Sequence, residues 1–119
     1  MINAQDFYNP VPLDLIMVKG DSMAFNFQLE GAEPRELTFS CKENPADTDA
    51  IFTQSLSGGG ITLISSEGGV LTYSVRVRPD QTSGLEPARY YYDLELMAGD
   101  DTITLMKGRL IVEWDATNY

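Results

Sequence analysis

The chain has 119 residues, with 18 Asp and Glu against 8 Lys and Arg, so its formal net charge is −10. A chain of this length is expected to form one domain with its own buried core, and so acidic a surface repels the phosphates of nucleic acids. It has no histidine and one cysteine, which excludes an internal disulfide, a Ser-His-Asp triad and zinc sites with His or four Cys ligands.

Short stretches of alternating apolar and polar residues dominate the chain, and this period of two predicts strands rather than helices. The first two predicted strands cover residues 13–18 and 22–29, with a turn at Gly20-Asp21 between them. In the second strand the odd positions are apolar and the even ones are not. One face is therefore expected in the core and the other in solvent or in a subunit contact.

Four further strands are expected in the middle of the chain, at residues 36–42, 50–56, 61–65 and 70–78. The second of these contains Phe52 and is expected near a sheet edge that is open to pairing with another strand. Three successive glycines at 58–60 mark a hairpin tip or a flexible loop. Cys41 lies in the apolar phase of its strand, which predicts a buried side chain rather than a reactive thiol.

A connection at residues 79–88 has room for one helical turn, and two strands at 89–97 and 102–115 complete the chain. Leu85, a short corner and the pattern Tyr90-x-Tyr92-x-Leu94 resemble the penultimate strand of an immunoglobulin-like domain. There a corner tyrosine bonds the backbone upstream, and an aromatic or aliphatic residue here replaces the usual cysteine.

The chain therefore predicts an all-β fold, an immunoglobulin-like antiparallel β-sandwich of seven to eight strands. Residues 1–12 are expected to form an N-terminal arm and residues 13–119 a single sandwich domain.

The last predicted strand changes the phase of its apolar residues. They occupy odd and then even positions: Ile103, Leu105, Leu110, Val112 and Trp114. A β-bulge at Lys107-Gly108 would return both sets to one face, and the alternative is a strand buried on both faces. Trp114 is in the core phase and is expected to be buried with blue-shifted fluorescence.

Carboxylates are the remaining candidates for chemistry. Asp47, Asp49 and the nearby Glu43 lie in a predicted loop, but they lack the spacing of a calcium-binding loop. Asp93 and Glu95 share one face of a strand, about 7 Å apart by the strand rise, whereas glycoside hydrolysis needs its two acids in a cleft. We therefore expect no enzyme activity, no catalytic residue, no metal and no cofactor.

Aromatic side chains outside the predicted core favour protein–protein contacts. The candidates for a protein interface are Phe7, Tyr8, Phe52, Tyr91 and Tyr119. Phe7 and Tyr8 lie in the Pro-flanked arm, which either reaches a neighbouring chain or folds over its own sandwich.

No apolar run is long enough for a membrane-spanning helix, and the N-terminus lacks the basic and apolar regions of a signal peptide. We expect no membrane partner and synthesis in a cytoplasm.

Four segments carry a family resemblance over roughly residues 15–115: VKGDS at 18–22 followed by Phe25 and Phe27, LTFSC at 37–41, YYYDLEL at 90–96 and KGRLIV at 107–112. In this order and spacing they resemble small β-sandwich domains of tailed-bacteriophage structural proteins, including the N-terminal domain of upper baseplate proteins. The resemblance implies a virion structural protein, as a tail, baseplate, adaptor or decoration subunit. Its partners would be other virion proteins, in a homo-oligomer or a ring.

Two other functions are considered. The net charge of −10 also suits a phage-encoded binding or inhibitor module that acts on a host factor, although its Asp and Glu residues are scattered rather than gathered in one stripe. A carbohydrate-binding sandwich would need an aromatic platform, which a buried Trp114 does not supply.

Overall fold

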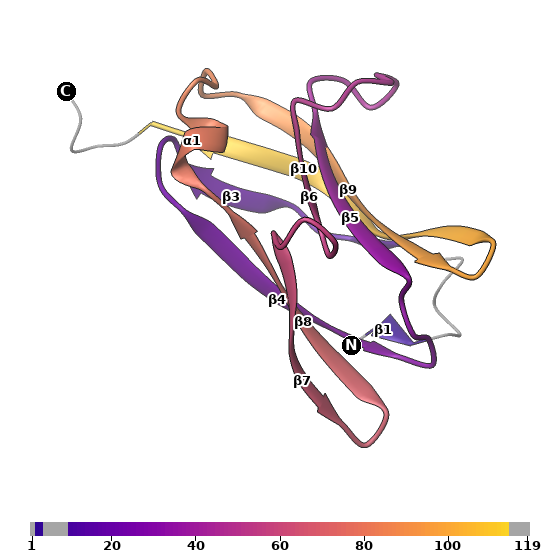
Figure 1. The fold of residues 1–119 in the computed structure, drawn as a ribbon. Helices are drawn as coiled ribbons and strands as arrows, with labels where there is room; N and C mark the ends of the chain where they lie inside the picture. Colours follow the sequence, from indigo (N-terminus) through magenta and orange to yellow (C-terminus); the bar gives the residue numbers. More distant parts are fainter. Residues whose placement is uncertain (1, 4–9, 115–119) are drawn as a thin grey trace.

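Two sheets pack face to face in the computed structural model, which describes residues 2–3 and 10–114 (Figure 1). The four-stranded sheet has the order β1-β4-β8-β7. Its strands are β1 (Ile2–Asn3), β4 (Met23–Glu30), β8 (Val70–Val77) and β7 (Ile61–Glu67).

The six-stranded sheet has the order β2-β10-β9-β5-β6, and β3 also pairs with β10. Its strands are β2 (Val11–Pro12), β10 (Asp101–Glu113), β9 (Arg89–Ala98), β5 (Glu36–Lys42), β6 (Phe52–Ser55) and β3 (Leu15–Val18). Eight strands in the described residues have four or more residues, and the one helix among them is the single turn α1 (Pro79–Thr82). The fold is therefore the predicted all-β, immunoglobulin-like sandwich. None of the helices in the described part is long and apolar enough to cross a membrane.

The long strand pairs are antiparallel, and the N-terminal strands add parallel ones. β1 runs parallel to β4, whereas β2 and β3 run parallel to β10 in the opposite sheet. Residues 2–3 and 11–12 of the predicted arm thus lie along the sandwich.

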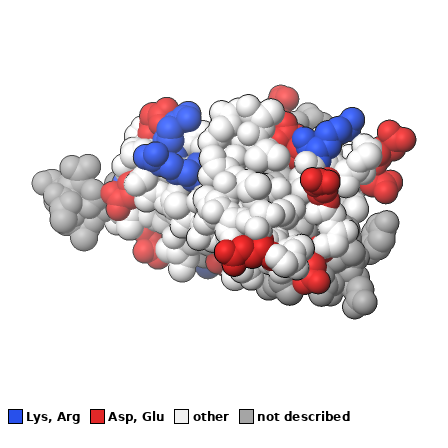
Figure 2. Space-filling model, turned by 60° about the horizontal axis from the view of Figure 1, so that its bottom comes forward, with Lys and Arg blue, Asp and Glu red and all other residues white. Residues whose placement is uncertain are grey.

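Charged side chains on the face seen in Figure 2 lie in separate places, mostly toward its margin. The middle of that face carries neither acidic nor basic side chains. The acidic residues of this face therefore do not form a single stripe.

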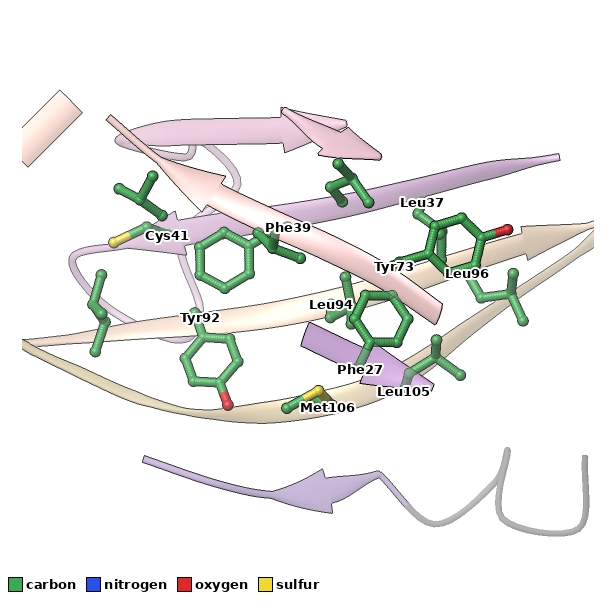
Figure 3. Packing of buried hydrophobic residues seen from close by; sticks show 14 of the residues in the cluster. Phe27, Leu37, Phe39, Cys41, Tyr73, Tyr92, Leu94, Leu96, Leu105 and Met106 are labelled. Atoms are coloured by element: carbon green, nitrogen blue, oxygen red, sulfur yellow. The ribbon is translucent and has the colours of Figure 1, made fainter. Parts of the chain in front are cut away.

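Aromatic rings from β4, β5, β8 and β9 lie in the core between the two sheets (Figure 3). The Phe39 ring on β5 stacks on Tyr92 of β9 with centroids 5.2 Å apart, and it lies 5.8 Å from the ring of Phe25 on β4. These rings link the strands that a disulfide and a tryptophan link in antibody domains. Cys41 is fully buried, as predicted, and this burial raises the pKa of its thiol to about 12.

A β-bulge does interrupt β10, but its predicted position at Lys107-Gly108 was wrong. The register shifts between Thr104 and Met106, so Leu105 is the extra residue. Both Leu105 and Met106 are buried, and the bulge allows these neighbours to enter the core together. Gly108 has a different role: a Cβ at this position would collide with the carbonyl oxygen of Leu13, because the N-terminal segment lies directly against β10.

The three glycines at 58–60 do not form a hairpin tip. They carry the chain from β6, which pairs with β5, to β7 in the other sheet. A Cβ at Gly60 would run into the side chain of Gln54. That buried amide donates hydrogen bonds to the carbonyl oxygen of Arg76 and to Oε1 of Gln81, so it joins β6 to the end of β8 and to α1.

Candidate protein-contact surfaces

A cavity of about 400 Å³ lies over neighbouring strands of the six-stranded sheet. The strand register explains its lining. Lys42 of β5 and Arg109 of β10 flank Tyr91 of β9, and Lys107 of β10 lies beside Asp93 of β9. Core residues alternate with these along the strands, so the lining side chains point away from the sandwich interior.

One side of the cavity is fixed by an ion pair between Asp14 and Arg109. Asp14 accepts hydrogen bonds from the Arg109 backbone N–H at 3.0 Å, from Nε at 3.2 Å and from Nη2 at 2.6 Å. The side-chain hydrogen bond with Arg109 is the main cause that lowers the pKa of Asp14. Both side chains stay partly exposed. The pair therefore mainly orients this part of the N-terminal segment on β10.

Asp93 is in a different environment. Its Oδ1 is closed to solvent and has no hydrogen-bond partner among the described residues. Desolvation raises the pKa of this carboxyl, and the nearby Lys42 opposes that effect. The ammonium groups of Lys42 and Lys107 have no described carboxylate oxygen within 4.0 Å. The cavity thus presents two unpaired cations around one half-buried carboxyl.

The two carboxyls of the cavity are poorly placed for acid–base chemistry. Arg109 occupies both oxygens of Asp14, and one oxygen of Asp93 is closed to solvent. A glycosidase needs two accessible acids that face one bond. The arrangement is better suited to binding a group that brings negative charge.

The predicted interface residues do not meet in one place. Tyr91 is half-buried in the cavity, whereas Phe52 points inward from β6 with its ring 6.3 Å from that of Phe39. Strand β6 does lie at the edge of its sheet, as predicted. Phe7, Tyr8 and Tyr119 lie outside the described residues.

The prediction that Trp114 is buried was wrong, because its side chain is 65% exposed. Strand β10 ends at Glu113. Trp114 continues the apolar alternation of the sequence but lies one residue past the end of the strand. The Lys19 ammonium lies 5.7 Å from the ring centroid, close enough for a cation–π contact. Because Trp114 is exposed, the argument from its burial against sugar binding no longer applies. A single ring beneath a lysine is still not an aromatic platform.

Strand β7 exposes an apolar edge that the sequence analysis missed. Leu63 is 49% exposed and Ile64 is 54% exposed, and β7 is the last strand of its sheet. The turn end of the β7–β8 hairpin extends away from the six-stranded sheet (Figure 1). In the sequence, the adjacent apolar residues at the end of Ile61-Thr62-Leu63-Ile64 break the alternation of this strand. That break could have indicated an exposed apolar side chain. The register shift between Leu63 and Ser65 leaves Ile64 unpaired.

The loop between β5 and β6 forms a second, acidic hollow. Glu43, Asp47 and Asp49 line it together with Ala50 and Ile51. Asp47 accepts a hydrogen bond from the backbone N–H of Asn44 at 3.1 Å, which closes a turn within the loop. No group of three or more Cys, Asp or Glu side chains suited to a metal ion occurs in the part of the chain that the structure describes.

No family model matches the sequence, and no curated protein matches it. Solved structures do. A marsupial T cell receptor is similar with a TM-score of 0.50 and 12% identity, over 91% of this chain and 51% of the receptor chain. A family 123 glycoside hydrolase from Clostridium perfringens is similar with a TM-score of 0.53 and 11% identity, over 93% of this chain and 25% of the hydrolase chain. This chain spans about half of the first protein and a quarter of the second. Such low identities establish the shared fold alone.

Proposed function

We propose that this chain is a non-enzymatic structural protein of a bacteriophage virion, a tail, baseplate, adaptor or decoration subunit that acts through protein–protein contacts. It is made in the host cytoplasm and incorporated into the particle. The resemblance carried by VKGDS, LTFSC, YYYDLEL and KGRLIV supports the assignment to virions.

The observation that carries the contact function is the cavity over β5, β9 and β10. It combines Tyr91, an amphipathic aromatic residue, with Lys42 and Lys107, two cations that have no carboxylate partner among the described residues. Tyrosine and arginine are enriched at protein interfaces, and Tyr91 and Arg109 both line this cavity. The open, apolar edge of β7 offers a second place for contact.

The test is to find the protein in particles. Phage particles from a lysogen or phage that encodes this chain are purified by density gradient, and their proteins are quantified by mass spectrometry. We expect the chain at several copies per particle, and immunogold label should show whether it lies on the tail or elsewhere on the particle. Its confinement to the soluble lysate would contradict the proposal.

A host-factor inhibitor is the second candidate, and the net charge of −10 favours it. An inhibitor would remain in the soluble fraction in complex with a host protein, and that complex would dissociate as salt rises. On the face that Figure 2 shows, the acidic residues lie apart rather than in one stripe, which favours the structural role for that face.

The N-terminal arm has its own test within the same system. Because residues 2–3 and 11–12 pair with the sheets, deletion of the arm would also remove strands. A phage with Phe7→Ala and Tyr8→Ala keeps the backbone and removes only the two rings. We expect fewer particles to incorporate this variant, and unchanged incorporation would show that the two rings make no contact.

A further inference from the structure

The cavity concentrates positive charge on a strongly acidic chain. Three of the eight Lys and Arg residues line it, Lys42, Lys107 and Arg109, against two of the 18 acidic residues. Asp14 is already paired with Arg109. Among the described residues, Lys42 and Lys107 are the lining cations without a carboxylate partner. A carboxylate brought between them would replace their hydration with an ion pair.

The acidic hollow of the β5–β6 loop adjoins this cavity along the chain. Lys42 and Pro45 line the basic cavity, while Glu43 and Asp49 line the acidic hollow. Glu43 and Asp49 are exposed and have no Lys or Arg partner among the described residues. Basic and acidic side chains thus follow one another directly along the chain where β5 passes into the β5–β6 loop.

Such a surface can bind a copy of itself. In a contact across a twofold axis, each patch meets the same patch on the other chain, so the contact must be self-complementary. A basic cavity beside an acidic loop meets this condition, because each copy offers both halves of the contact.

We propose that a second copy of this chain docks on this face, with the acidic β5–β6 loop of each copy against the basic cavity of the other. The inference rests on the proposed role as a contact-making subunit and names the partner of the cavity. Two chains of charge −10 repel each other over most of their surfaces. The cavity is the place where approach of a second copy brings cations to carboxylates, and Tyr91 supplies its apolar contact area.

The first measurement is the mass of the purified full chain by sedimentation velocity over a wide concentration range and at two salt concentrations. We expect a dimer that weakens by about tenfold or more between about 0.1 M and about 1 M salt, as the Debye length falls from about 10 Å to about 3 Å. A monomer under all conditions would overturn the inference.

Two charge-reversed variants give the decisive test. The cavity variant carries Lys42→Glu and Lys107→Glu, and the loop variant carries Glu43→Lys and Asp49→Lys, which leaves the Asp47 turn intact. Alone, each variant would place like charges against each other at both contacts of its homodimer. The dissociation constant of that homodimer should rise by about tenfold or more, so the variant should be monomeric where the wild type is a dimer. An equimolar mixture restores both attractive contacts and should form a mixed dimer of wild-type strength.

Arg76→Glu is the matched control. Arg76 is exposed on β8 in the other sheet and has no carboxylate partner among the described residues. It should leave the dimer unchanged, and circular dichroism melts establish that all variants fold. The inference would be overturned if the charge reversals left the dissociation constant of the dimer unchanged, or if the mixture of the two variants stayed monomeric. If the dimer dissociates with Ile64→Lys instead, the contact is the β7 edge. None of these outcomes bears on the presence of the chain in particles.

Discussion

The hydroxyl of Tyr90 donates a hydrogen bond of 2.8 Å to the carbonyl oxygen of Glu86, four residues upstream. This bond ties the start of β9 to the connection that follows α1, and it is the corner contact that the pattern Tyr90-x-Tyr92 predicted. Tyr92 makes a longer-range bond, from its hydroxyl to the carbonyl oxygen of Leu13. The two tyrosines thus anchor β9 both to its own approach and to the N-terminal segment.

Removal of the Tyr90 hydroxyl should therefore destabilise the fold. Tyr90→Phe leaves the Glu86 carbonyl without this donor and is expected to lower the free energy of unfolding by about 1 kcal/mol. Urea denaturation followed by circular dichroism measures the change. Tyr91→Phe is the control, because the Tyr91 hydroxyl makes no hydrogen bond to a described residue, and equal losses in both variants would refute the corner role.

Gly108 should tolerate no side chain. In Gly108→Ala the new methyl group meets the backbone of Leu13, so either β10 or the segment between β2 and β3 must move. We expect a loss of about 1–3 kcal/mol in the free energy of unfolding, the usual cost of overpacking. Gly84→Ala is the matched control, since a Cβ there meets no atom within 4 Å. Similar stabilities of the two variants would show that the close approach is not maintained.

The Cys41 thiol should resist modification until the chain unfolds. The side chain is fully buried and its pKa is raised from 9.0 to about 12, so little thiolate is present near neutral pH. The rate of labelling by a disulfide reagent should rise steeply in urea at the midpoint of unfolding. Fast labelling of the native protein would mean that β5 opens locally.

The same raised pKa predicts how stability changes in alkali. Above pH 9.0 the thiol ionises in the unfolded chain but stays protonated in the folded one until about pH 12. The folded state then binds more protons, so stability falls as pH rises through this range. Tyr92 adds to the slope, because burial raises its pKa from 10.0 to about 12. Cys41→Ala should show a shallower fall in denaturation midpoint, and an identical slope would contradict this account.

The ion pair beside the cavity predicts a titration shift. Arg109 lowers the pKa of Asp14 from its ordinary value of 3.8, so the pair stabilises the fold above that pH and is lost as pH falls through the lowered value. Arg109→Gln should move the pKa of Asp14 back toward 3.8, as measured by NMR of the carboxyl carbon. Arg35→Gln, which removes an exposed charge elsewhere, should leave the titration unchanged.

Trp114 should report an exposed site. A side chain that is 65% exposed is expected to emit at long wavelength, to be quenched readily by acrylamide and to shift little on unfolding. Lys19→Gln should increase quenching, because the ammonium that covers part of the ring is removed. Blue-shifted emission would place the ring inside the sandwich after all.

Local pattern was enough to predict most strands and the corner tyrosine. Strand β5 and the buried side of Cys41 follow directly from alternation, because each side chain on a strand points to the face opposite its neighbour's. The bulge in β10 was also detectable as a change of phase. Its position was not, because either Leu105 or a residue near Gly108 would restore the phase, and core packing selects between them.

The sequence by itself determined that this is an acidic, immunoglobulin-like sandwich with one buried thiol. Strands and turns can be predicted locally, because the alternation of buried and exposed residues and the choice of turn residues involve only a few neighbouring positions. Only the tertiary structure decided which surfaces are available. It placed Tyr91, Lys42 and Lys107 from separate strands around one cavity, left Trp114 beyond the last covered residue and exposed the β7 edge. These outcomes depend on the strand order and on how far each strand extends over the opposite sheet. Both are determined by contacts between residues that are distant in the chain.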